Sequence, residues 1–279
     1  MTKFAGADDL RAAEFVHTSL RGARFTGVDL SEAVIREADL CKVRMRAVDV
    51  RDSEIDAPWL FEAENYLLVN GVDVVPLVDA ELNRRFPGRV ERHADDPAGL
   101  RSAWSALERT WSATLERVQT MPTGTVDISI DGEWSFAQTL RHLIMATDTW
   151  LGRAILEKDQ PYHPIGQPDS SYEDDGRSPF QTERPTYSDV LDVRAGRVAM
   201  MRDFLAAATA DELAAPRKNP HAPEHEETVL SCLHTILEEE WEHHRYAVRD
   251  LDAIDVRTGV RTGARIAASE RRRRPDDVR

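Results

Sequence analysis

The stretch "LHTILEEEWEHHRYAVRDL", Leu233 to Leu251, places four glutamates, a tryptophan and two adjacent histidines within seven positions. At 100° per residue, a helix here carries one apolar stripe, formed by Val229, Leu233, Leu237, Val248 and Leu251. Glu240 and His244 fall inside that stripe, one helical turn apart. A carboxylate in an apolar stripe is costly unless it is paired or bound to a metal. The sequence therefore predicts a helix that turns at least one Glu/His pair inward.

Two further features extend this pattern. Glu239 and His243 form a second pair of the same spacing, on the flank of the stripe. His142 lies in "SFAQTLRHLIMATDTWLGRAILE", a helical pattern whose first residue, Ser135, is a candidate N-cap. Three N/O ligands from two helices, with a fourth position open, are typical of a catalytic zinc or nickel site. A buried, hydrogen-bonded histidine explains His142 as well, so the residues alone leave metal and no metal open.

Most of the chain reads as one helical domain. Besides the two patterns above, helices are expected in "GLRSAWSALERTWSATLERVQTM" and "SDVLDVRAGRVAMMRDFLAAAT". The first has an apolar stripe that contains Trp104, Leu107, Trp111, Leu115 and Val118. These segments predict a four-helix domain over residues 96–256, preceded by a linker over residues 62–95 with a short helix from Val74 to Phe86. The remaining residues, 257–279, lack periodicity and are expected to be disordered.

The first sixty residues follow a different period. Every fifth residue from Leu10 to Leu60 is apolar, and small side chains precede most of them by two positions. A period of five fits neither a helix nor a flat strand and is a sign of a repeat. Segments such as "GARFT" and "GVDLS" resemble the pentapeptide-repeat family, which forms a right-handed quadrilateral β-helix. The resemblance implies a short β-helix over residues 1–61, with its bulky apolar residues inward, that serves as a scaffold or docks a protein partner.

Composition limits the classes of function. The chain has 279 residues and a net charge of 36 − 50 = −14, which argues against nucleic acid as a partner. It has no apolar run long enough for a membrane span and no apolar signal core at its start, so a cytoplasmic, soluble protein is expected. Only Cys41 and Cys232 occur, which excludes a disulfide framework and a cysteine zinc motif.

Two segments together resemble a known superfamily. "DGEWSFAQTLRHLIMATDTWL" and, far downstream, "EEEWEHHRYAVRDL" are similar to the DinB-like superfamily in its actinobacterial form, over roughly residues 62–252. The resemblance implies an up-down-down-up four-helix bundle that binds a divalent metal through three histidines. His142 and His244 match the first and last ligands, and Glu240 stands where the middle histidine is usual. The pattern E-E-W-x-H instead favours the flanking pair, Glu239 and His243, so the choice between the pairs stays open.

The superfamily includes thiol S-transferases and isomerases that use mycothiol, bacillithiol or glutathione. A metal-bound thiol is a better nucleophile because the metal lowers its pKa. Since neither cysteine is positioned for this role, a low-molecular-weight thiol cofactor is expected. The loop from Lys158 to Thr186 is long enough to be functional, and its Tyr162 and His163 are candidate substrate contacts.

Arg245 and Arg249 are candidate contacts for carboxylates or hydroxyls of the cofactor. Two other functions remain open at this point. One is a scaffold without catalysis, and the other is a metal-dependent hydrolase that acts through bound water.

Overall fold

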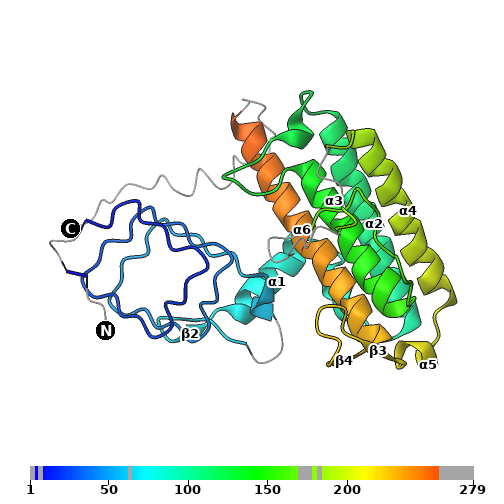
Figure 1. Cartoon of the computed structure of the whole chain (residues 1–279), viewed down its shortest axis with the longest axis horizontal. Coiled ribbons are helices and arrows are strands. Elements are labelled where there is room, and N and C mark those ends of the chain that lie inside the picture. Colours follow the sequence, from blue (N-terminus) through cyan, green and yellow to red (C-terminus); the bar gives the residue numbers. More distant parts are fainter. Residues whose placement is uncertain (1–3, 6–8, 62–64, 169–177, 181–183, 258–279) are drawn as a thin grey trace, which may run out of the picture. The chain divides into compact units, whose positions relative to one another are not determined.

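The computed structural model of the protein describes residues 4–5, 9–61, 65–168, 178–180 and 184–257 (Figure 1). The chain divides into two compact units, Met1–Ile55 and Asp56–Arg279. Most of the tail expected to be disordered, from residue 258 onward, lies outside the described residues.

The first unit repeats its backbone conformation every five residues. A positive φ recurs at every fifth position from Ala12 to Asp52. Turn hydrogen bonds recur every ten residues, beginning with the Ala13 N–H, which donates to the Leu10 carbonyl over 3.0 Å. A left-handed conformation costs a non-glycine residue about 1 to 2 kcal/mol. The recurring positive φ shows that the backbone repeats with the same five-residue period as the sequence.

The described residues of this unit do not form the expected apolar interior. The side chains of the five-residue series from Leu10 to Ile55 are exposed, with Leu30 at 55% and Ile35 at 62%, and the expectation that they point into a packed interior is wrong for these residues. The described part of the unit also contains no strand, so it does not show the quadrilateral β-helix. The turn hydrogen bonds join residues only three apart, and such local bonds do not bring apolar side chains of successive coils into contact.

The second unit is helical, as expected. Its elements, in chain order, are η1 (Pro58–Phe61), β1 (Leu68–Val69), β2 (Val72–Asp73), α1 (Val75–Arg85), η2 (Arg89–His93), α2 (Pro97–Gln119), η3 (Thr125–Asp127), α3 (Phe136–Thr147), the π-helical turns η4 (Asp148–Ile155), α4 (Tyr187–Ala207), α5 (Ala210–Leu213), β3 (Pro216–Lys218), β4 (Glu226–Thr228) and α6 (Val229–Arg257). The strands form two antiparallel hairpins, β1 with β2 and β3 with β4. The short helix predicted between Val74 and Phe86 is confirmed as α1.

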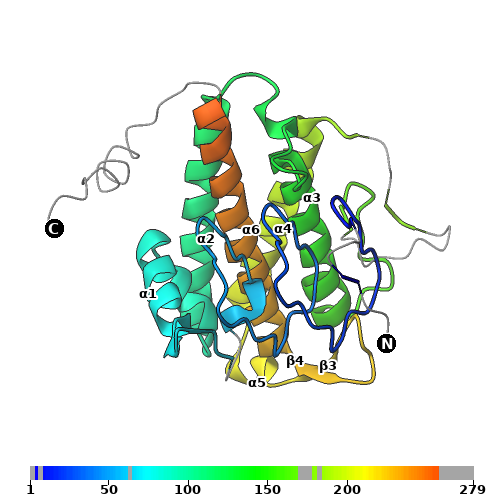
Figure 2. The ribbon, with the colours of Figure 1, turned by 90° about the vertical axis from the view of Figure 1, so that its left-hand side faces the viewer.

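The long helices α2, α3, α4 and α6 lie alongside one another and enclose the core (Figures 1 and 2). Each contributes a buried apolar stripe, represented by Leu107, Leu140, Met201 and Leu237, none of which is more than 1% exposed. The stripe predicted on α2 is largely confirmed, with Leu115 only partly buried. Burial of these faces is the main favourable contribution to folding. This burial also determines which residues of α3 and α6 face each other outside the core.

The start of α3 is fixed by local chemistry. The Ser135 hydroxyl accepts a hydrogen bond from the Gln138 N–H, and the Gln138 side chain accepts one from the Ser135 N–H. This capping box confirms Ser135 as the N-cap. At its other end α3 continues into the wider turns of η4, where buried Asp148 faces α4 and its Oδ1 accepts a hydrogen bond from Arg197 Nε over 2.6 Å.

Among the described residues, no helix combines the length and the apolar character needed to cross a membrane.

The packing predicts a clear contrast between two leucine-to-alanine substitutions. Leu233 on α6 is fully buried, so Leu233→Ala should lower the free energy of unfolding by about 2 to 5 kcal/mol. Leu77 on α1 is 64% exposed, and Leu77→Ala should change it by no more than about 0.5 kcal/mol. Urea unfolding followed by tryptophan fluorescence measures both, and equal losses would contradict the assignment of the core.

Candidate metal centre

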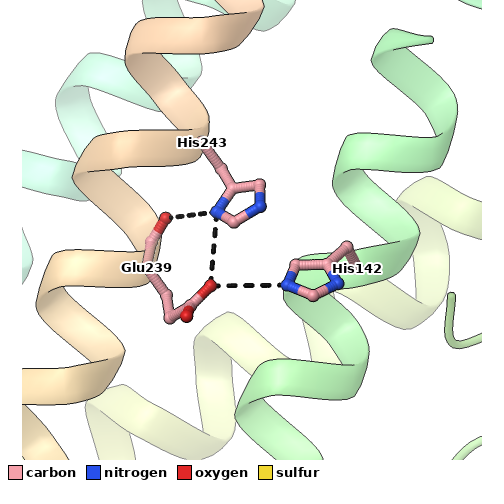
Figure 3. A group of neighbouring side chains, drawn as sticks. All are labelled: His142, Glu239 and His243. Carbon is pink, nitrogen blue, oxygen red and sulfur yellow. Dashed lines mark hydrogen bonds and ion pairs between the residues drawn. The ribbon is translucent and has the colours of Figure 1, made fainter. Parts of the chain in front are cut away.

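The flanking Glu/His pair of α6 meets His142 of α3 (Figure 3). One candidate ligand atom from each of His142, Glu239 and His243 lies within 4.8 Å of the other two. Within the described part of the chain, these three form the one group of His, Cys, Asp or Glu side chains close enough to share a metal ion. Their side chains are 8%, 32% and 14% exposed, so the group is reached from solvent on its Glu239 side.

The ring of His142 is oriented by the loop that follows η4. Its Nδ1 lies 3.1 Å from the backbone carbonyl oxygen of Gln167, which can only accept a hydrogen bond. The proton of a neutral ring is therefore on Nδ1, and Nε2 carries the lone pair. The loop is itself tied to α3, because the Gln167 N–H donates to the Arg141 carbonyl and Arg141 Nε donates to the Ile165 carbonyl.

The lone pair of His142 points at a second acceptor. Its Nε2 lies 3.4 Å from Oε2 of Glu239. Burial alone would raise the pKa of Glu239, but its hydrogen bond with His142 and its proximity to His243 outweigh burial and leave the pKa lowered. An ionised carboxylate and an imidazole lone pair repel each other unless a proton or a cation lies between them. The geometry therefore fits either a proton on Nε2 of His142 or a metal cation at this point.

His243 turns its Nδ1, rather than Nε2, toward Glu239. Its Nδ1 lies 2.9 Å from the backbone carbonyl oxygen of Glu239, one turn earlier, and 3.3 Å from Oε2 of the same residue, which leaves Nε2 with the lone pair. Burial and then the nearby charge of His142 lower the pKa of His243 to about 4. The ring is thus neutral at neutral pH, as a metal ligand must be.

Aromatic rings surround the two histidines. The His142 and His243 rings stack with centroids 4.6 Å apart, and Trp134 lies 4.6 Å from the first and 6.1 Å from the second. The tight turn at Asp131 and Gly132, both with positive φ, delivers Trp134 to this position. Sequence reasoning missed Trp134, although Asp-Gly is a recognised turn signal that could have located it.

Glu240 and His244 turn away from His142. Glu240 is 1% exposed, and both of its oxygens accept hydrogen bonds from Arg194 Nη2 of α4, over 2.5 and 2.6 Å. Nε2 of His244 lies 2.8 Å from the hydroxyl of Thr114 on α2. The structure therefore does not assemble the expected trio of His142, Glu240 and His244. One residue of offset along α6 is a rotation of 100°, and it directs the two pairs to different neighbouring helices.

The predicted loop contacts serve the loop itself. The His163 N–H donates to Asp148 over 2.8 Å, and His163 Nδ1 accepts from the Ile165 N–H over 3.2 Å. Tyr162 packs against Phe180, with ring centroids 5.5 Å apart. These contacts hold the segment that delivers the Gln167 carbonyl to His142. Part of the loop, residues 169–177 and 181–183, lies outside the described residues.

The two predicted arginines lie close to the histidines but are engaged. Arg245 and Arg249 both bind the carboxylate of Asp56, and each also pairs with an acidic neighbour on α6. Nothing in the sequence indicated Asp56, because it lies nearly 200 positions upstream of its partners.

Neither cysteine is suited to act as a nucleophile at this site. Cys232 is fully buried in the core, and its burial raises the pKa of the thiol to about 11. Cys41 belongs to the first unit, and its hydrogen bond with Asp39 raises the pKa of its thiol as well.

Comparison with known proteins gives two family matches. The model of the DinB superfamily matches residues 106–247, about half of the chain, a range that contains all three residues of the candidate centre. The model of pentapeptide repeats matches residues 9–46, in eight copies. Neither the curated proteins nor the solved structures include a significant match.

The buried pair predicts a stability difference that separates it from a surface pair. Arg194→Met leaves the Glu240 carboxylate buried without its cation, so the free energy of unfolding should fall by about 3 to 5 kcal/mol. Arg202→Met removes an exposed pair with Glu108 and should cost no more than about 1 kcal/mol. Urea titration of both variants measures the contrast. Similar small losses would mean that Arg194 does not hold Glu240.

Proposed function

This chain belongs to the DinB superfamily, and we propose that it binds one divalent metal ion through His142, Glu239 and His243. The observation that carries the proposal is the convergence of His142, Glu239 and His243, each of which has one candidate ligand atom within 4.8 Å of those of the other two. Membership of the superfamily supports a metal-binding role in general. The choice of this trio over Glu240 and His244 rests on the separate partners of those two residues, Arg194 and Thr114.

The donor set suits zinc or nickel. Two imidazole nitrogens and one carboxylate oxygen are ligands that both ions accept, and three protein ligands leave a position for a substrate or cofactor. Two backbone carbonyls set the tautomers of the proposed ligands. The carbonyls of Gln167 and Glu239 accept from Nδ1 of His142 and of His243, which leaves Nε2 of each neutral ring without a proton.

We propose that the reaction is transfer of a low-molecular-weight thiol to a small electrophile, or isomerisation of such a compound. When bound, a divalent ion would lower the pKa of a coordinated thiol and make the thiolate available as a nucleophile. The chain supplies no cysteine of its own for this role, which supports an external thiol such as mycothiol, bacillithiol or glutathione. Trp134 and Tyr246, whose rings contact His243, would exclude water from one side of the nucleophile.

The remaining finer assignments are also proposals. We propose that α2, α3, α4 and α6 form a four-helix bundle of up-down-down-up topology, which their mutual packing supports. We propose the repeat unit, residues 1–61, as a surface for a protein partner, because its apolar side chains are exposed.

Metal analysis of the purified protein tests the proposed centre. After loading with zinc or nickel and removal of the excess, the parent should retain one ion per chain. His142→Ala and Glu239→Gln should lose stoichiometric metal, because each removes one of three ligands. His163→Ala and Glu238→Gln, the latter a half-exposed acid of the same helix, are the matched controls and should retain it. Retention by the first two variants, or equal loss in the controls, would contradict the assigned ligands.

Thiol binding tests the proposed chemistry. Metal-loaded protein should bind at least one of mycothiol, bacillithiol and glutathione at millimolar concentration, measured by calorimetry or by a rise in melting temperature. His142→Ala should abolish the binding. If none of the three thiols binds the loaded parent, the transferase proposal fails, and a scaffold without catalysis becomes the better account.

A further inference from the structure

Two arginines of α6 converge on one carboxylate. Arg245 Nη1 and Nη2 donate to the two oxygens of Asp56 over 3.1 and 2.5 Å, a bidentate arrangement. Arg249 Nη1 donates to the same carboxylate over 3.2 Å. The side chains of Arg245, Arg249 and Asp56 are 19%, 34% and 26% exposed, so the contact is partly open to solvent. Bidentate arginine–carboxylate contacts are among the strongest hydrogen bonds in proteins.

Each guanidinium is held in place by a second acid. Arg245 Nε and Nη2 donate to Glu242 over 3.0 and 2.7 Å. Arg249 Nε donates to Asp250 over 2.8 Å. Both cations also lie over the ring of Tyr246, at 4.5 and 5.2 Å from its centroid. Glu242, Asp250 and Tyr246 thus hold the two guanidinium groups. The N–H groups that face Asp56 would keep their orientation if Asp56 were absent.

The cluster of Arg245, Arg249 and Tyr246 adjoins the candidate metal centre. The ring of Tyr246 meets that of His243 edge-on, with centroids 5.8 Å apart. Arg245 lies two positions after His243, about 200° around the helix, and Arg249 lies one turn beyond Arg245. The link between the two groups is the ring of Tyr246, which contacts His243 and both guanidinium groups.

We propose that Arg245, Arg249 and Tyr246 form a binding subsite for a carboxylate of the thiol cofactor or its conjugate, and that Asp56 occupies this subsite as an internal competitor. The inference rests on the proposed function for the identity of the ligand, but the subsite itself needs no metal. Asp56 is the first residue of the second compact unit, directly after Ile55, so it is joined to α6 through contacts within one unit.

The competition has a predictable strength. A tethered carboxylate acts on its own site at an effective concentration of the order of millimolar. A free carboxylate ligand then binds only to the fraction of molecules whose Asp56 has left, and its apparent affinity falls by that fraction. Removing the charge of Asp56 should restore the intrinsic affinity, a gain of about tenfold or more.

Calorimetry with S-methylglutathione on the full-length, metal-free protein tests this proposal. The probe carries two carboxylates and has no thiol to bind a metal. Asp56→Asn should bind it at least about tenfold more tightly than the parent. Asp56→Asn combined with Arg245→Met should lose that gain. Glu108→Gln frees Arg202 from its ion pair in the same way, and as the matched control it should gain nothing.

Two outcomes would overturn the subsite. One is an Asp56→Asn variant that binds no more tightly than the parent while its melting curve shows that it is folded. The other is a gain in Asp56→Asn that survives Arg245→Met. Failure of the metal or thiol experiments above leaves this result unaffected, since the probe and the metal-free protein involve neither. The two proposals can therefore fail separately.

Discussion

The ion pair between Arg194 of α4 and Glu240 of α6 fixes how α6 is rotated about its own axis. Both partners are at least 93% buried, and the two carboxylate oxygens share one guanidinium nitrogen. A buried charge cannot give up its partner without a large loss of stability. Burial raises the pKa of Glu240, and Arg194 offsets only part of that rise. The two hydrogen bonds from Arg194 hold the carboxylate at one place in the core. With Glu240 fixed toward α4, Glu239 must lie about 100° away, toward α3.

That rotation creates the candidate centre. Glu239 and His243 come to face His142, and the contact of His244 with Thr114 supports the same rotation from the side of α2. Two residues outside the candidate centre then orient its histidines. The Gln167 carbonyl sets the tautomer of His142, and Trp134 packs against the rings of His142 and His243. The partly exposed ligands are thus oriented by interactions made elsewhere, in the core and in a loop.

Much of this was predictable from periodicity. The stripe of α6, the stripe of α2 and the N-cap Ser135 follow from local rules and are seen in the structure, except that Val248 and Leu115 are only partly buried. The sequence also predicted that one Glu/His pair is buried and another lies beside it, but the buried pair and the pair in the candidate centre are different pairs. The buried carboxylate of Glu240 forms an ion pair with Arg194. No local pattern in the sequence identifies Arg194 among the arginines of the chain. Gln167 and Asp56 depend on loop paths, which periodicity does not describe. In the repeat unit, the period of five persists in the backbone, although the expected burial does not.

The most direct test of this account is an anomalous-scattering measurement on crystals of the zinc-loaded protein, at and below the zinc edge. The account predicts a single zinc peak between α3 and α6, bonded to Nε2 of His142, a carboxylate oxygen of Glu239 and Nε2 of His243, with Arg194 still on Glu240. A peak coordinated by Glu240 and His244, or no ordered zinc at His142, would contradict it.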